Sequence, residues 1–129
     1  MIPEKFEDIL NSTALAHVAT VGPKGEPQNN PVWFDWDGER IRFSQLPVRQ
    51  KYRNLQREPR VALSIVDPQN PYRYIEVRGV VERLEADPDG TFMNKLAKKY
   101  TGQDTWGGAH TGEQRVTLVV KPEHTTHMG

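Results

Sequence analysis

Residues 28–45 read QNNPVWFDWDGERIRFSQ, and this stretch decides the fold. Gln28–Trp36 has the pattern of an extended strand. Asp37-Gly38 follows it directly, and an Asp-Gly pair between two extended runs indicates a tight hairpin. In the return run, Glu39–Gln45, apolar and charged side chains alternate, which is typical of a strand buried on one face. The stretch therefore predicts two neighbouring antiparallel strands.

The flanking sequence predicts more strands, with short helices inserted between them. Further strands are expected at Ala14–Val21, Arg60–Val66, Tyr72–Leu84 and Arg115–Lys121. Helices are expected over Phe6–Leu10, over Pro47–Gln56 and from the Asp87-Pro88 cap to Gly102. Gly79 inside a strand indicates a bulge or a close backbone approach. Six short strands with inserted helices predict a mainly β protein, a small antiparallel barrel.

Composition excludes several classes of protein. The chain has 129 residues, which fits one domain over 1–129. Lys and Arg number 17 and Asp and Glu 17, so no overall field attracts nucleic acid or an anionic membrane. The absence of cysteine excludes disulfides, thiolate zinc sites and a cysteine nucleophile. The start, MIPEKFEDIL, lacks a signal-peptide pattern and no run is long enough to span a membrane, so we expect a cytoplasmic protein.

Positive charge is concentrated in one segment of this neutral chain. Residues 49–60 contain five Lys or Arg residues and one Glu. Arg49, Gln50 and Lys51 fall in the first turn of a predicted helix, where the helix dipole favours acidic side chains. Cations and free backbone N–H groups at that end predict a site for a phosphate or carboxylate. A solvated basic face is the alternative interpretation.

Aromatic residues form a second group. Trp33 lies on one predicted strand, Tyr72 and Tyr74 lie on another, and Trp106 lies in the Gly-rich stretch 101–114. Flat side chains in this arrangement suit a planar heterocycle. Packing in the core explains Phe34 and Trp36 equally well.

The same stretch holds two residues with open roles. Trp106 stands beside Gly107-Gly108, so we expect it in a lid or a subunit contact. His110 lies nearby and could face a ligand.

Nothing in the sequence indicates chemistry performed by side chains alone. His124 and His127 lack a carboxylate-rich partner segment, and we expect no metal site. No Ser-His-Asp order and no pair of catalytic carboxylates is evident. If the protein is an enzyme, its chemistry belongs to a bound cofactor.

Three segments of the chain resemble a known superfamily. They are AHVATVGPKGEPQNNPVWFDWDGERIRFS (16–44), RQKYRNLQREPRVALSIVDPQNPYRYIEVRGVVE (49–82) and LAKKYTG (96–102). The most specific pieces are Asn-x-Pro-Val-Trp with its Asp-Gly hairpin, Lys-x-x-Asn-Leu-x-x-x-Pro-Arg-Val, and Asn-Pro-Tyr-Arg-Tyr. They are similar to the pyridoxamine 5′-phosphate oxidase-like split β-barrel superfamily, also described as FMN-binding-protein-like. Within it they most resemble the branch of coenzyme F420-dependent reductases.

This resemblance implies a homodimer with two cofactor sites at its interface. The cofactor is coenzyme F420, with FMN as the alternative, and the reaction is hydride transfer between the deazaflavin and a conjugated small organic molecule. A non-catalytic flavin- or deazaflavin-binding protein remains the other alternative. The ending KPEHTTHMG lacks a basic substrate-binding segment, so we do not expect oxidation of pyridoxamine phosphate itself.

The resemblance also assigns site residues. It implies that the cofactor phosphate is bound at the helix start and that the ring rests along two strands. The partner subunit would contribute aromatic side chains. The cofactor-binding residues implied in this way are Asn30, Pro31, Val32, Trp33, Phe43, Ser44, Arg49, Gln50, Lys51, Asn54, Tyr72, Tyr74 and Trp106; no catalytic residue is assigned.

Overall fold

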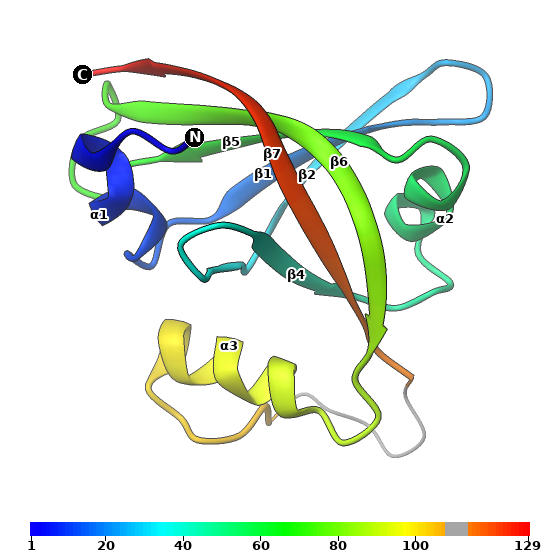
Figure 1. The fold of residues 1–129 in the computed structure, drawn as a ribbon. Helices are drawn as coiled ribbons and strands as arrows, with labels where there is room; N and C mark the ends of the chain where they lie inside the picture. The colour runs from blue at the N-terminus through cyan, green and yellow to red at the C-terminus, as the bar shows by residue number, and fades with distance from the viewer. Residues whose placement is uncertain (108–113) are drawn as a thin grey trace.

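A computed structural model of the chain describes residues 1–107 and 114–129 (Figure 1). Its elements are η1 (Glu4–Phe6), α1 (Glu7–Leu10), β1 (Ala16–Val21), β2 (Pro27–Val32), β3 (Asp35–Trp36), β4 (Ile41–Gln45), α2 (Gln50–Arg57), β5 (Arg60–Val66), β6 (Tyr74–Ala86), α3 (Thr91–Thr101) and β7 (Val116–Met128). The mainly β prediction with short helices is confirmed. Within these residues no helix is long and apolar enough to cross a membrane.

The strands form one antiparallel sheet that curls on itself. Their order is β2-β1-β5-β6-β7-β4-β3, with every neighbouring pair antiparallel. The two edge strands, β2 and β3, are consecutive in the chain and only Trp33 and Phe34 separate them. The sheet must therefore bend until its first and last strands meet, which makes it a split barrel. We call the two-residue crossing between these edges, Trp33-Phe34, the seam.

Two strand predictions differ from the structure by more than two residues at an end. The expected single strand Gln28–Trp36 is divided into β2 and β3 at the seam, because the chain there passes from one sheet edge to the other. The expected last strand, Arg115–Lys121, continues to Met128 in β7, where it pairs with the whole length of β6. Its polar C-terminal half gave no local signal of a strand. The barrel accordingly has seven strands among the described residues, not six.

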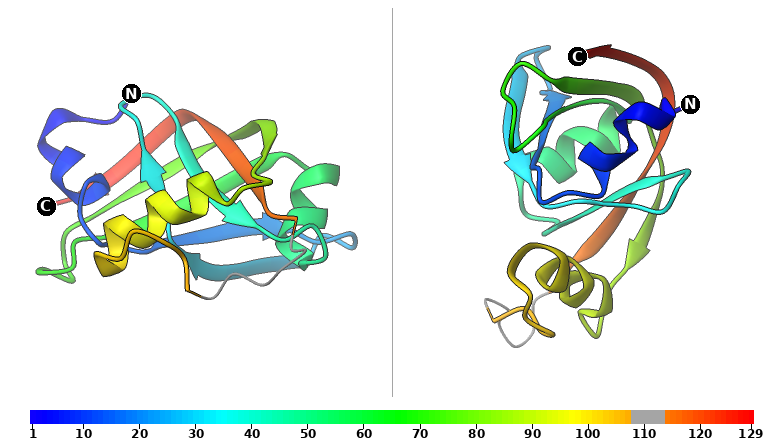
Figure 2. Two further views of the ribbon diagram at one scale, coloured as in Figure 1. Left: turned by 90° about the horizontal axis from the view of Figure 1, so that it is seen from below. Right: turned by 90° about the vertical axis from the view of Figure 1, so that its left-hand side faces the viewer.

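The core fills the barrel, and helices cover it from outside. The largest buried side chains include Phe6, Phe34 and Phe43, each with no exposed surface. Figure 2 shows α1 across one end of the barrel and α3 outside the wall. Phe6 is the last residue of η1, directly before α1, and it belongs to the same apolar cluster as the strand residues. The N-terminal segment therefore closes one end of the core.

Gly79 is required by a close approach of two strands. The pairing of β6 with β7 shifts register between Arg78 and Gly79. A Cβ added at Gly79 would collide with the backbone carbonyl of Lys121. The expectation of a bulge or close approach at this glycine is confirmed.

The end of α3 holds the seam in place. Phe34 N donates to Tyr100 Oη at 3.2 Å, and Tyr100 Oη donates to Ala14 O at 2.6 Å. Lys99 Nζ donates to Phe34 O at 2.8 Å and to Leu10 O at 3.1 Å. Burial raises the pKa of Tyr100 to about 12 and lowers the pKa of Lys99 to about 8. These contacts join α3, the end of α1 and both sheet edges.

Replacing Tyr100 with Phe is expected to lower the free energy of unfolding by about 1–3 kcal/mol. The substitution keeps the ring but leaves the Phe34 N–H and the Ala14 carbonyl without this partner. Urea unfolding followed by tryptophan fluorescence measures the change. Tyr72→Phe is the control, because Tyr72 is 78% exposed. Equal stability of both variants and the wild type would show that the seam does not depend on this hydroxyl.

Candidate functional site

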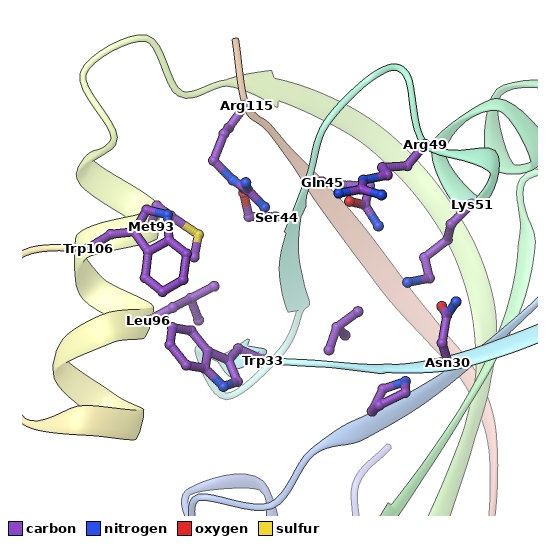
Figure 3. Close-up of a pocket in the computed structure, with 12 residues that line it drawn as sticks. Asn30, Trp33, Ser44, Gln45, Arg49, Lys51, Met93, Leu96, Trp106 and Arg115 are labelled. Carbon is purple, nitrogen blue, oxygen red and sulfur yellow. The ribbon is translucent and has the colours of Figure 1, made fainter. Parts of the chain in front are cut away.

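The site is a cavity of about 430 Å³ beside the seam, within the size range of small-molecule sites. It lies between β2, β4, the start of α2 and α3 (Figure 3). Its lining residues are Asn30, Pro31, Val32, Trp33, Ser44, Gln45, Arg49, Lys51, Met93, Leu96, Trp106 and Arg115. Three of these are cations and none is a carboxylate. A cavity with this lining favours an anionic ligand.

Most of the predicted cofactor-binding residues line this cavity. The eight that line the cavity are Asn30, Pro31, Val32, Trp33, Ser44, Arg49, Lys51 and Trp106. Four lining residues were missed by sequence reasoning: Gln45, Met93, Leu96 and Arg115. Met93 and Leu96 lie three residues apart on one apolar face of α3, and no sequence signal separates a cavity wall from core on such a face. Gln45 and Arg115 lie at the ends of predicted strands, and no local signal showed that those ends face a cavity.

Five predicted residues lie elsewhere. Phe43 is buried in the core, because neighbouring strand residues point to opposite faces and Ser44 takes the cavity face. Gln50 and Asn54 border a different hollow, near the β1–β2 turn. Tyr72 is exposed, and neither Tyr72 nor Tyr74 lines this chain's cavity.

Lys51 is a buried cation at one end of the cavity. Only 4% of its surface is exposed. Within residues 1–107 and 114–129 its ammonium group has no hydrogen-bond or ion-pair partner. Burial, with a smaller contribution from the charge of Arg49, lowers its pKa to about 8. A buried charge without a partner is costly, and an anionic ligand would remove that cost.

The start of α2 adds backbone donors to this cation. Arg49 precedes the helix and provides no side-chain cap, and the first turn contains no acidic residue. The first turn of α2 therefore has backbone N–H groups without a side-chain acceptor, and these groups and the positive end of the helix dipole lie beside Lys51. Figure 3 shows the Arg49 and Lys51 side chains reaching into the cavity. We call this part, with Arg49, Lys51 and the neighbouring Asn30, the anion end.

A buried polar network fixes α2 against the sheet. Asn54 has no exposed surface; its Nδ2 donates to Thr20 Oγ1 at 3.0 Å and to Gln28 Oε1 at 3.3 Å. Its Oδ1 accepts from Gln50 Nε2 at 2.7 Å. These bonds hold the helix one turn beyond Lys51. Asn54 and Gln50 thus support the anion end without lining it.

Aromatic rings form the opposite wall. Trp33 stacks on Tyr100 with ring centroids 5.2 Å apart and planes 4° apart, and Trp106 meets Trp33 edge-on at 5.3 Å. Trp106 N donates to Asn94 Oδ1 on α3 at 2.9 Å. Trp106 lines the chain's own cavity, and the expectation that it serves as a lid or subunit contact stays a prediction. His110 lies outside the described residues.

The α3 side of the wall is fixed by a buried carboxylate. Asp87 accepts from Phe92 N and Met93 N, each at 3.1 Å, so it caps α3 as expected, although the helix begins at Thr91. This cap sets the first turn of α3, from which Met93 faces the cavity. Apolar Met93 and Leu96 complete the wall with Trp33.

The cavity can therefore hold an anion at one side and a flat ring between its walls. Within the described residues, no group of three or more His, Cys, Asp or Glu could bind a metal. The fold and the cavity together define a split-barrel protein with a cavity that is cationic at one end and aromatic at the other.

Comparison with known proteins identifies the family and the fold. A family model described as pyridoxamine 5′-phosphate oxidase matches residues 2–129, and the chain belongs to this family. A solved structure called F420 reductase is 45% identical, with a TM-score of 0.88 over 97% of this chain and 98% of that one. A conserved hypothetical protein from Mycobacterium tuberculosis is 24% identical, with a TM-score of 0.73 over 99% of this chain and 84% of that one. General Stress Protein 26 from Bacillus anthracis is 17% identical, with a TM-score of 0.69 over 97% and 92%. The last two show the fold alone.

Replacing Lys51 with Met is expected to stabilise the ligand-free protein at pH 7. The folded-state pKa near 8 lies below the ordinary 10.5, so the unfolded chain binds this proton more tightly. At about 1.4 kcal/mol per pKa unit, protonated Lys51 costs up to about 3 kcal/mol below pH 8, and the cost vanishes as the pH rises towards 10.5. Urea unfolding should show a more stable variant at pH 7 and no gain at pH 10.5.

The same variant should bind anions less well. Losing a charge-assisted contact weakens phosphate binding by about 1.5–3 kcal/mol. The rise in melting temperature on adding inorganic phosphate measures this, with Lys24→Met, an exposed lysine of the β1–β2 turn, as the control. A Lys51→Met protein that is less stable at pH 7, or that responds to phosphate as the wild type does, would contradict the assignment.

Proposed function

We propose that the protein is an oxidoreductase that uses coenzyme F420 to transfer a hydride to a conjugated small organic molecule. One observation carries the proposal: the same cavity has buried Lys51 at one end and the Trp33–Trp106 pair at the other. Lys51 has no ion-pair or hydrogen-bond partner among the described residues. Phosphate and a tricyclic ring are the two parts of F420 that this arrangement fits. The 45% identity to a structure called F420 reductase supports the choice of cofactor.

Each part of the cavity has a role in binding. Arg49 and Lys51, with the start of α2, bind the phosphate. Asn30 to Trp33 and Ser44 lie along the space left for the ring. The aromatic wall excludes water from the ring's face, which protects a bound hydride donor from side reactions.

The residues of the cavity bind and orient but do not supply a proton. When bound, the reduced deazaflavin supplies the hydride and both electrons that the acceptor gains. The described lining contains no His, Tyr, Asp or Glu side chain, and its one lysine lies at the anion end. The proton that completes reduction of the acceptor would come from solvent or from Tyr72 of the second copy.

Purified protein is expected to bind F420 in preference to FMN. Both carry a phosphate and a tricyclic ring, so the anion end alone does not separate them. Titration with each cofactor, followed by its fluorescence, should give at least about tenfold tighter binding of F420, roughly 1.4 kcal/mol. Reduced F420 should then be oxidised by conjugated acceptors.

Two outcomes would replace this proposal. Tight retention of FMN without F420 binding would make the protein an FMN-dependent relative. Saturable F420 binding without oxidation of any acceptor would make it a non-catalytic deazaflavin-binding protein. Lys98→Gln, an exposed cation on α3 outside the cavity, is the binding control.

We further propose that two copies of the chain complete each site. Tyr72 is 78% exposed and does not line its own chain's cavity, and Val48, next to Arg49, is 76% exposed. Large exposed apolar side chains such as these are typical of a surface that a partner protein covers. In a twofold dimer, Tyr72 and Tyr74 of the second copy would reach the ring bound beside Arg49.

Mixing two defective variants tests this arrangement. Lys51→Met and Tyr72→Ala should each bind F420 weakly. A mixed dimer has one site with both residues intact and one with neither, so random exchange should restore about a quarter of the sites. Fluorescence titration after refolding the mixture counts them. Sites restored to no more than the level of the separate variants, or a protein that sediments as a monomer, would contradict the shared site.

A further inference from the structure

Lys51 places an amine, which is a nucleophile when it is neutral, inside the cavity. The residue is 4% exposed, and Figure 3 shows its side chain reaching into the cavity with the amine directed towards Asn30. Among the described residues no carboxylate lines this cavity, and the amine has no hydrogen-bond or ion-pair partner. The amine of the ligand-free protein is therefore buried and unbonded at the edge of a space that a small molecule can enter.

The charges around this amine are positive. Burial, and to a smaller extent the charge of Arg49, lowers the pKa of Lys51 to about 8. The positive end of the α2 dipole lies on the same side. Arg115 lies across the cavity, where it contacts Ser44, and β2, β4 and α3 contribute only uncharged side chains to the described lining. Nearby cations that disfavour an ammonium group favour an anion at the same place.

Lys99 shows that a lowered pKa alone does not make such a site. Burial lowers its pKa to about 8 as well, but its Nζ donates to Phe34 O at 2.8 Å and to Leu10 O at 3.1 Å. An anion on this nitrogen would lose both bonds and would face two carbonyl oxygens and the charge of Asp35. The amine of Lys51 has no such bonds to lose and faces cations instead.

We propose that Lys51 of the ligand-free protein reacts reversibly with carbon dioxide, and that the resulting carbamate occupies the anion end. The neutral amine attacks the carbon of CO₂; the N–C bond forms, one C–O π bond breaks, and its electron pair moves to oxygen. One N–H proton passes to solvent, and nothing is oxidised or reduced. The product is an anion that pairs with the Arg49 guanidinium and with the positive end of α2.

Carbamate and phosphate exclude each other at the anion end. Both need Arg49 and the space beside Lys51, and the carbamate removes the cation on which phosphate binding depends. Raising the concentration of CO₂ is therefore expected to weaken phosphate binding, and phosphate is expected to release CO₂. The inference rests on the anion end and does not depend on F420 as the cofactor.

The test detects the new covalent bond directly. Ligand-free protein labelled with ¹⁵N-lysine is equilibrated with ¹³C-labelled CO₂ and bicarbonate at pH 8, and a one-bond ¹³C–¹⁵N coupling in the NMR spectrum reports a carbamate. At this pH about half of the Lys51 amine is neutral, against roughly one part in three hundred for an ordinary lysine. Trapping with triethyloxonium, followed by peptide mass spectrometry, identifies the modified lysine.

The expected modification is specific to one lysine. Lys51 should carry at least about tenfold more label than Lys99 or the exposed Lys24. Lys51→Met should lose the coupling, and Lys24→Met should keep it. Arg49→Gln should reduce the label on Lys51 about tenfold, because the carbamate loses a charge-assisted contact, and Arg49→Lys should recover part of it. Equal labelling of Lys51 and Lys24, or an Arg49→Gln protein labelled as the wild type is, would overturn the proposal.

Competition with inorganic phosphate provides the second measurement. The rise in melting temperature that phosphate causes is measured with and without CO₂ and bicarbonate, at constant pH and with chloride balancing the ionic strength. The rise should shrink in the wild type and stay unchanged in Lys51→Arg, which keeps a positive charge but has no amine. Equal CO₂ effects in both proteins, without a ¹³C–¹⁵N coupling, would identify bicarbonate as an ordinary competing anion and overturn the proposal. F420 titrations in CO₂-free buffer test the proposed function separately, so either idea can fail without the other.

Discussion

The crossing of the chain from β2 to β3 is the constraint on which the rest of the structure depends. Two residues join the edges of a seven-stranded sheet, and both have large aromatic side chains. Phe34 turns into the core and Trp33 turns to the cavity. The hydroxyl of Tyr100 and the ammonium of Lys99 satisfy the backbone of Phe34 and of the N-terminal segment together. One crossing thus closes the barrel and positions a wall of the site.

Stability and ligand binding make opposite demands on this cavity. The whole chain has no net charge, yet the cavity lining carries three cations and no acid. Outside the cavity several arginines are paired with carboxylates: Arg73 contacts Asp8 and Asp67, and Arg42 contacts Asp37 and Glu85. Leaving Lys51 without such a partner destabilises the empty protein and increases the gain when an anion binds. The uneven pairing of charges therefore marks the site more clearly than the total charge does.

The sequence predicted the parts of the site whose signals are local. The Asp-Gly hairpin, the basic start of α2 and the buried strands each depend on residues close together in the chain. Phe43 and Ser44 show the limit of that reasoning, since Ser44 lines the cavity while Phe43 is buried in the core, and no local signal separated these two neighbours. Arg115 and Met93 reach the cavity only through the pairing of β7 and the docking of α3. These contacts join residues far apart in sequence, and no periodicity reports them.

The structure also locates where ligand choice can arise within the family. Proteins that share 17–24% identity with this chain keep the barrel. A fold by itself does not specify a ligand. An anion end can serve any phosphorylated ring, because a phosphate presents the same oxygens whatever it is attached to. Under the proposed function, discrimination between rings would come from the other side, where Trp33, Trp106 and Arg115 line the cavity. Trp106 is held by α3 and Arg115 precedes β7, whereas Trp33 belongs to the seam that closes the barrel.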